Sequence, residues 1–200
     1  MGLSMPKCLP LALVTLFLGV LCGCGYTGNK RVEPSVAPAQ PWAEKLERPG
    51  VENLHKVSAD LYRGAQPTKE GFKSLKDLGV KTVICLRGLH SDPEDVDTLG
   101  MAREHIPMEP WHPETEDVVK FLKLVKDPSR GPFFVHCQRG SDRTGMLCAI
   151  YRIVIQGWTR ADAIEELKHG GYDFAELWSG IVKYLETFDI DAVKKQAGIE

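Results

Sequence analysis

Cys137 and Arg143 lie six positions apart, at the junction of an apolar strand-like run and an apolar helix-like run. A thiolate is a good nucleophile, and the pKa of a thiol falls at a helix N-terminus or beside a cation. A loop between a strand and a helix can turn its amides toward a phosphate, and a guanidinium offers two parallel hydrogen bonds to phosphate oxygens. The pair therefore predicts phosphoryl transfer through a phosphocysteine intermediate, with Cys137 as nucleophile and Arg143 as phosphate clamp.

The residues around this pair complete a predicted phosphate-binding loop. We expect the loop amides to hold the phosphate oxygens, and the Thr144 hydroxyl to donate to the sulfur and make it a better leaving group. Arg139 either adds positive charge to the substrate site or is an exposed, solubilising residue. The predicted substrate-binding residues are Gln138, Arg139, Gly140, Ser141 and Thr144.

Alternating apolar segments predict the elements that position this loop. We expect strands at 61–63, 81–86, 106–108 and 133–135, and helices at 68–78, 92–104, 115–126, 143–154, 159–167 and 175–188. Strand–helix alternation predicts an α/β fold, with a mostly parallel central sheet flanked by helices on both faces. The loop after the 133–135 strand would then lie at the carboxyl end of a central strand, where such sheets bind ligands.

The motif His136-Cys137, five residues, Arg143-Thr144-Gly145 resembles the signature of the Cys-based protein tyrosine and dual-specificity phosphatases. The stretches 61–67 (LYRGAQP) and 81–87 (KTVICLR) are similar to the opening of the atypical dual-specificity phosphatases of plant, fungal and bacterial type. The resemblance covers about Asp60 to about Phe174. It implies the same fold, a reaction that needs no metal and no cofactor, and a His136 that holds the loop and the sulfur in place.

The sequence marks the general acid less clearly than it marks the nucleophile and the phosphate clamp. Many members of this family carry an acidic Asp in a loop that precedes the Cys, but no Asp lies at the expected place here. The carboxylates available in that region are Glu109, Glu114, Glu116 and Asp117. Some lipid-active members use an Asp inside the phosphate loop instead, so we predict Asp142 as the acid and Glu114 as the next candidate. A purely structural hydrogen-bonding role for Asp142 is the alternative.

Cys85 ends a predicted strand that should neighbour the strand leading to Cys137. In some lipid phosphatases of this superfamily, a comparable Cys traps the oxidised nucleophile as a disulfide. The resemblance thus suggests a redox role for Cys85, whereas packing as a small hydrophobic residue is the alternative.

The N-terminus has the pattern of an exported lipoprotein. Lys7 precedes an apolar run over residues 9–20, and Leu21-Cys22-Gly23-Cys24 resembles a bacterial lipobox. The run is shorter than the roughly 20 residues of a membrane-spanning helix. We expect residues 1–23 to be a signal peptide, Cys24 to be lipidated, residues 24–50 to be a Pro-rich tether and residues 51–200 to be the catalytic domain. The protein would then be a membrane-anchored lipoprotein that faces the periplasm.

Composition limits the remaining possibilities. At 200 residues and 43% hydrophobic content, the chain has room for one domain with a real core plus an extension. A net charge of −2 argues against a nucleic-acid-binding protein. Three cysteines fall in the N-terminal segment and three in the body, too few for a disulfide scaffold, and no metal-ligand spacing is present.

The predicted function is hydrolysis of a phosphomonoester, as a tyrosine or dual-specificity protein phosphatase. The alternatives are an inositol phosphate or phosphoinositide phosphatase and an inactive phosphate-binding module. The expected partners are a phosphorylated protein or an inositol phosphate, together with a membrane through the lipid anchor.

Overall fold

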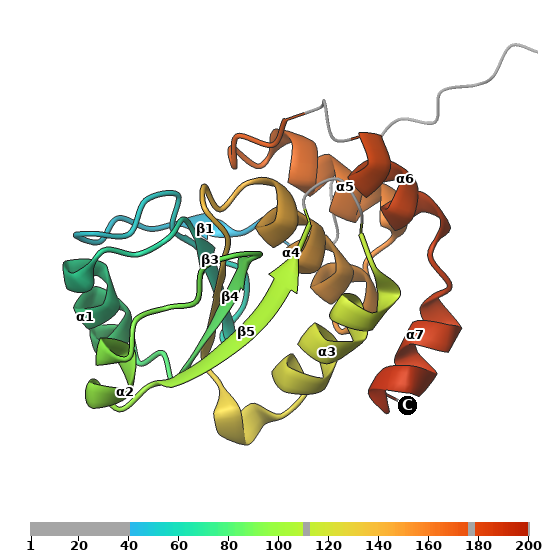
Figure 1. Cartoon of the computed structure of the whole chain (residues 1–200). Coiled ribbons are helices and arrows are strands. Elements are labelled where there is room, and N and C mark those ends of the chain that lie inside the picture. The colour runs from blue at the N-terminus through green and yellow to red at the C-terminus, as the bar shows by residue number, and fades with distance from the viewer. Residues whose placement is uncertain (1–40, 110–112, 176–178, 200) are drawn as a thin grey trace, which may run out of the picture. The chain divides into compact units, whose positions relative to one another are not determined.

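A six-stranded sheet lies at the centre of this computed structural model, which describes residues 41–109, 113–175 and 179–199 (Figure 1). Across the sheet the strands follow the order β1, β2, β3, β6, β4, β5. Strands β3, β6, β4 and β5 run parallel, and β1 and β2 add antiparallel pairs at one edge. The predicted mostly parallel sheet is therefore confirmed. The strand bounds are β1 Glu44–Lys45, β2 His55–Lys56, β3 Leu61–Gly64, β4 Thr82–Arg87, β5 Ala102–Met108 and β6 Phe133–His136.

Helices cover both faces of the sheet, as predicted. Helices α1 and α2 lie on one face, and α3 to α7 lie on the other (Figure 1). The helix bounds are α1 Lys69–Asp77, α2 Asp95–Thr98, α3 Thr115–Val125, α4 Asp142–Val154, α5 Arg160–His169, α6 Ser179–Thr187 and α7 Ile190–Ala197, with a short 3-10 helix at Pro128–Arg130. No helix in the described ranges is long and apolar enough to cross a membrane.

The central strand β6 is buried along its whole length and sorts its side chains between two cores. Successive side chains of a strand point to opposite faces. Phe134 accordingly packs in the core beneath α1, whereas Phe133 and Val135 pack in the larger core beneath α3 and α4. This alternation fixes β6 in register, so the residues that follow it emerge at a defined point of the sheet edge.

Local capping explains why several helices begin where the sequence predicts. The Thr68 side chain accepts a hydrogen bond from Gly71 N–H at the start of α1, and Thr159 accepts one from Asp162 N–H at the start of α5. Gly79, with a φ of +83°, ends α1 in the left-handed region that glycine adopts without strain.

The predicted helix over 92–104 is mostly wrong. Helix α2 spans only Asp95–Thr98, and β5 begins at Ala102, well before the predicted strand at 106–108. Gly100 takes a φ of +71°, which ends the helix, and β5 then pairs with β4 from Ala102 onward. Pairing at the sheet edge thus overrides a polar sequence with weak strand character.

The helix predicted over 175–188 ends within one residue of its predicted end, but it is not the last helix. The helix predicted over 175–188 is seen as α6 at Ser179–Thr187, and a further helix, α7, follows at Ile190–Ala197. The Asp189 side chain accepts a hydrogen bond from Ala192 N–H (2.9 Å) and so starts this new helix.

The predicted boundary between tether and domain at residues 50 and 51 needs correction. Glu44 and Lys45 form β1 and pair with β2, and the Ala43 N–H donates to Glu166 in α5 (2.7 Å). The domain therefore begins before residue 43. Residues 1–40, which include the predicted signal peptide and Cys24, lie outside the described residues.

Candidate active site

Cys137 follows β6 directly, and the loop from Cys137 to Ser141 leads into α4 at Asp142. Strand β6 has a parallel neighbour on each side, so this loop lies at the carboxyl end of a central strand. The predicted position of the loop is confirmed.

The carbonyls of the first loop residues are held by donors outside the loop. His136 Nδ1 lies 3.1 Å from the Cys137 carbonyl oxygen, and Gln66 N–H donates to the Gln138 carbonyl (3.2 Å). In a trans peptide unit the C=O and the following N–H point in opposite directions. Carbonyls that point outward therefore leave the next N–H groups directed into the loop.

The next carbonyls follow the same rule. Asn53 Nδ2 donates to the Arg139 carbonyl (3.1 Å), and Arg63 Nη2 donates to the Gly140 carbonyl (2.6 Å). The Ser141 carbonyl accepts from the first turn of α4. A row of inward N–H groups next to a helix N-terminus binds an anion, as the sequence predicted.

Gly140 allows the loop to come this close to β3. Its φ is +74°, and a Cβ added there would lie 2.4 Å from the backbone carbon of Gly64. Any side chain at position 140 would push the loop away from the donors that hold it.

Cys137 is 3% exposed and lies at the base of this loop. Burial alone would raise its pKa, but the hydroxyl and N–H of Thr144, the charge of Arg143 and the N–H of Gly140 outweigh burial and hold the pKa below its ordinary value. The buried Thr144 hydroxyl makes no other hydrogen bond within the described residues, so it is available to donate to the sulfur. This is the environment of a reactive thiolate.

Arg143 is anchored on one side only. Its Nη1 donates to the carbonyls of Leu86 (3.2 Å) and Met108 (3.1 Å), at the ends of β4 and β5. Within the described residues its Nε–H and other amino group have no partner. These two donors are the pair that a guanidinium presents to two oxygens of one phosphate.

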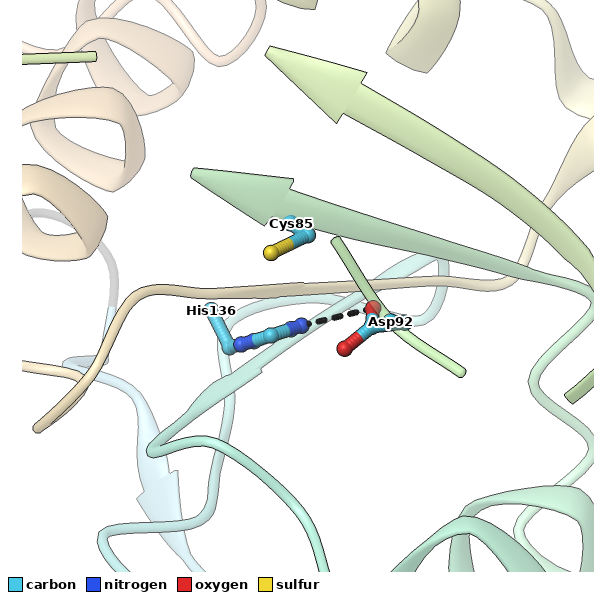
Figure 2. Close-up of side chains that lie close together, drawn as sticks. All are labelled: Cys85, Asp92 and His136. Carbon is cyan, nitrogen blue, oxygen red and sulfur yellow. Dashed lines mark hydrogen bonds and ion pairs between the residues drawn. The ribbon is translucent and has the colours of Figure 1, made fainter. Parts of the chain in front are cut away.

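His136 is buried and paired with Asp92 on the side of the sheet that faces α1 and α2 (Figure 2). Its Nε2 lies 2.9 Å from Asp92 Oδ2. Burial alone would lower the pKa of His136, but the hydrogen bond to Asp92, together with Cys85, raises it to about 9. Because its Nδ1 holds the Cys137 carbonyl, His136 ties the base of the loop to Asp92, which agrees with the supporting role predicted for it.

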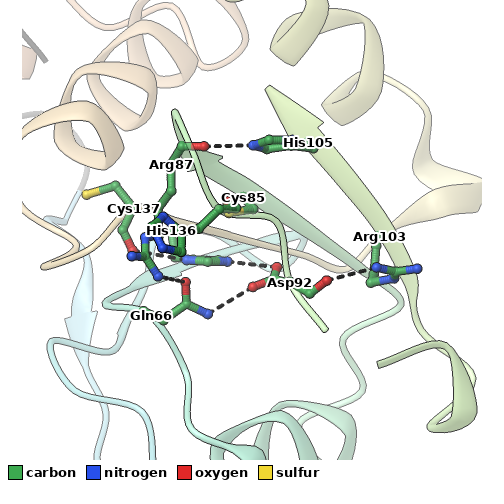
Figure 3. Close-up of polar contacts among 9 residues, drawn as sticks. Gln66, Cys85, Arg87, Asp92, Arg103, His105, His136 and Cys137 are labelled. Carbon is green, nitrogen blue, oxygen red and sulfur yellow. Dashed lines mark hydrogen bonds and ion pairs between the residues drawn. The ribbon is translucent and has the colours of Figure 1, made fainter. Parts of the chain in front are cut away.

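Asp92 is held in turn by a polar network (Figure 3). Gln66 Nε2 donates to its Oδ1 (2.9 Å), and Arg87 Nη1 donates to the Gln66 side-chain oxygen (3.2 Å). Arg103 in β5 donates to the Asp92 carbonyl (2.8 Å). Gln66 thus acts in the network beneath the loop as well as through its own N–H.

Cys85 lies beside His136 and not beside Cys137. Its register partner on β6 is His136, so the two side chains share a face of the sheet, and its thiol donates to the His90 carbonyl (3.3 Å). Figure 3 shows the Cys137 sulfur directed away from Cys85. Both cysteines are free and buried, and the redox role of Cys85 stays a prediction, with packing as a small hydrophobic residue as its alternative.

Ligand atoms of Cys85, Asp92 and His136 all lie within 4.8 Å of one another, which is close enough for a metal ion. A metal would have to displace the proton that His136 shares with Asp92, and the raised pKa of His136 keeps that proton bound at neutral pH. The cluster is therefore better described as a buried ion pair than as a metal centre.

Asp142 makes two structural contacts. Its Oδ1 accepts from Ala175 N–H (3.1 Å) and its Oδ2 accepts from Arg139 (3.2 Å). These contacts match the alternative role that the sequence allowed for Asp142. Its role as general acid stays a prediction.

Two other carboxylates lie near the sheet edge. Glu114 is exposed at the N-terminus of α3, and Glu109 follows β5, with its carboxylate near Gly88. Because Arg143 binds the Met108 carbonyl, Glu109 lies one residue from a direct contact of the phosphate clamp.

The predicted substrate-binding residues divide by exposure. Gln138 and Arg139 are exposed, whereas Gly140, Ser141 and Thr144 are buried in the loop.

Sequence reasoning did not find Asn53 and Asp92. Asp92 has a signal in the sequence, because it is an acidic residue followed by Pro93 shortly after a buried strand; Asn53 has no comparable signal.

Comparisons with known proteins agree with this geometry. Residues 42–177 match the family model described as DSP-PTPase phosphatase fused to NAD+ kinase. The chain is 30% identical over 191 residues to the dual specificity protein phosphatase TpbA of Pseudomonas aeruginosa, covering 92% of this chain and 85% of TpbA. The crystal structure of P. aeruginosa TpbA superposes with a TM-score of 0.67, covering 78% of this chain and 96% of that one. The inositol diphosphatase SIW14 of Saccharomyces cerevisiae is 26% identical over 184 residues, covering 86% of this chain and 64% of SIW14.

Proposed function

The chain belongs to the DSP-PTPase phosphatases, and from this premise we propose that it dephosphorylates phosphotyrosine in proteins, with Cys137 as nucleophile. One observation supports the proposal above all: a buried thiol of lowered pKa lies in a loop whose carbonyls are bonded outward. Beside it, Arg143 keeps two donor groups without a hydrogen-bond partner among the described residues. Phosphotyrosine is favoured because TpbA is named a dual specificity protein phosphatase and has been solved in complex with pTyr.

The reaction follows from these positions. The Cys137 thiolate attacks phosphorus while Arg143 and the inward N–H groups hold the non-bridging oxygens. The bond from phosphorus to the leaving oxygen breaks, and a carboxylic acid protonates that oxygen. Water then attacks the phosphocysteine and gives a proton to the carboxylate that this first step left behind, the sulfur leaves as thiolate with a hydrogen bond from Thr144, and inorganic phosphate departs.

Replacing the nucleophile tests the proposal. In the full chain, Cys137→Ser should abolish hydrolysis of a phosphotyrosine peptide while inorganic phosphate still binds. Cys148→Ala removes another buried thiol of the same core and should retain turnover. Unchanged turnover in Cys137→Ser would overturn the mechanism.

An inositol phosphate is the second candidate substrate, because relatives named inositol diphosphatase cover most of this chain. The exposed Arg139 within the loop supports a highly charged substrate. Specificity constants for phosphotyrosine peptides and for inositol phosphates, measured side by side, distinguish the two candidates.

We further propose that the protein is an exported lipoprotein attached to a membrane through Cys24. The support is the sequence alone: a short apolar run, the lipobox-like Leu21-Cys22-Gly23-Cys24 and the Pro-rich segment that follows. Because one acyl chain binds a membrane only weakly, stable attachment requires more than one. Mass spectrometry of the mature N-terminus should find an acylated residue 24, and an unmodified N-terminus elsewhere would contradict the proposal.

A further inference from the structure

Arg63 is a fully buried cation directly behind the phosphate loop. It lies on β3 opposite Val135 of β6, and it is 2% exposed. Its Nη2 donates to the Gly140 carbonyl (2.6 Å) and, more weakly, to the Ser141 carbonyl (3.4 Å). A Cβ added at Gly145 would lie 3.5 Å from the same nitrogen, so the guanidinium also lies against the first turn of α4.

The Arg63 charge has no carboxylate partner among the described residues. Its guanidinium lies 3.7 Å from the centre of the Tyr172 ring, a cation–π contact, and its Nε–H is buried without a partner. The nearby buried carboxylate, Glu166, is already bound by Arg152 through two hydrogen bonds of 2.8 and 2.7 Å. Glu166 therefore balances the charge of Arg152, and Arg63 is left without a carboxylate of its own among the described residues.

The Arg63 charge lies where the protein already presents positive groups. The inward loop N–H groups and the N-terminus of α4 are the positive ends of backbone dipoles. An unpaired buried cation is costly, and placing it behind other positive groups adds to that cost. A phosphate dianion held in the loop would offset all of these terms together.

We infer that Arg63 is a positioning residue of the reaction, resting on the proposed function: it turns the Gly140 and Ser141 carbonyls out of the loop and supplies the buried positive charge that the phosphate dianion balances. The residue does not touch the substrate. Its effect reaches phosphate through the loop backbone and through its electric field, which the low-dielectric interior screens only weakly.

Three substitutions in the full chain separate charge from packing. Arg63→Met removes the charge and the donors but keeps a long side chain, and Arg63→Lys keeps the charge. Leu167→Ala is the matched control, because Leu167 is buried beside Gly145 and has no polar group. The measurements are the dissociation constant of inorganic phosphate by calorimetry, kcat and KM for an aryl phosphate, and the melting temperature.

We expect Arg63→Met to weaken phosphate binding by about tenfold or more, as for the loss of a charge-assisted interaction in a buried site. Arg63→Lys should recover most of this affinity, and Leu167→Ala should lower the melting temperature without changing phosphate affinity. If Arg63→Met does not fold, Arg63→Gln serves as the neutral variant.

Three results would overturn the inference: a neutral variant that binds phosphate as tightly as wild type, a Lys variant that binds it no better than the neutral one, or an equal loss of affinity in Leu167→Ala. The proposed function alone would be overturned by a different result. In that case the Arg63 variants lose phosphate affinity as expected, but the wild-type chain hydrolyses no aryl phosphate.

Discussion

His136 Nε2 and Asp92 Oδ2 lie 2.9 Å apart, and both side chains are sealed from solvent. This buried pair connects the segment that follows β4 to the base of the catalytic loop, because the other ring nitrogen of His136 lies 3.1 Å from the Cys137 carbonyl oxygen. Stability and loop geometry therefore depend on the same two side chains.

Asp92→Asn should lower the free energy of unfolding by about 3 kcal/mol, since removing one partner leaves a buried charge uncompensated. Chemical denaturation measures this change. Asp97→Asn is the matched control, because Asp97 binds Arg103 at an exposed position and its loss should leave stability nearly unchanged. Equal effects of the two substitutions would contradict a special role for the buried pair.

The same pair predicts how stability varies with pH. The folded pKa of His136 is raised to about 9 from 6.5, so its contribution is fully present below pH 6.5 and is lost as pH rises through about 9. The pKa of Asp92 is lowered: burial opposes this, and the bonds from His136 outweigh it. Its contribution is thus present above pH 3.8 and is lost as pH falls through the folded pKa. Denaturation curves measured between pH 6 and about 10 should show that the free energy of unfolding of the wild type falls as the pH rises. The free energy of unfolding of Asp92→Asn should change less over the same range.

Thr144→Val should move the acid limb of the profile of kcat/KM against pH toward higher pH. Burial already favours the neutral thiol, and the hydroxyl is one of the groups that hold the pKa of Cys137 below its ordinary value. Thr144→Ser keeps the hydroxyl and should leave the limb in place. A Val variant with the wild-type limb would show that the hydroxyl does not stabilise the thiolate.

Arg143→Lys should reduce kcat/KM by on the order of 100- to 1000-fold, as for other preorganised donors in transition states. A guanidinium can bind the Leu86 and Met108 carbonyls and still offer two donors to phosphate, whereas an ammonium cannot do both. Steady-state kinetics with an aryl phosphate measures the loss. Arg130→Lys, which changes an arginine paired with Glu104 on the surface, should retain wild-type rates.

The general acid can be identified from how strongly the rate of hydrolysis depends on the leaving group. If Asp142 protonates the leaving oxygen, Asp142→Asn should slow a substrate with a poor leaving group, such as an alkyl phosphate, far more than an aryl phosphate with a good one. If Asp142 only binds Ala175 and Arg139, both substrates should slow equally. Glu109→Gln and Glu114→Gln, tested with the same two substrates, then identify the carboxylate that acts.

A chain shortened to begin at residue 51 should be less stable than one that begins at residue 37. The shorter chain lacks β1 and the Ala43 N–H that donates to the buried Glu166 carboxylate. Loss of a donor to a buried charge costs about 1–3 kcal/mol. Chemical denaturation of both chains measures the difference, and equal stabilities would restore the domain boundary at residue 51.

The sequence by itself determined the fold class, and it was enough to predict Cys137 as the nucleophile and Arg143 as the phosphate clamp. These depend on short-range information: the six-residue spacing of Cys137 and Arg143, the apolar run of β6 and the periodic apolar face of α4 are all local to one stretch of chain. Local capping likewise placed the starts of α1 at Thr68 and of α5 at Thr159.

Only the tertiary structure decided how the loop is held and which face Cys85 occupies. Asn53, Arg63 and Gln66 hold loop carbonyls from a segment more than 70 residues earlier in the chain, and Asp92 reaches His136 across 44 positions. Such contacts depend on which strands become neighbours and in which register, and a register shift of one residue would turn every side chain to the opposite face. The parallel pairing of Cys85 with His136, which no local pattern encodes, is what separates Cys85 from Cys137.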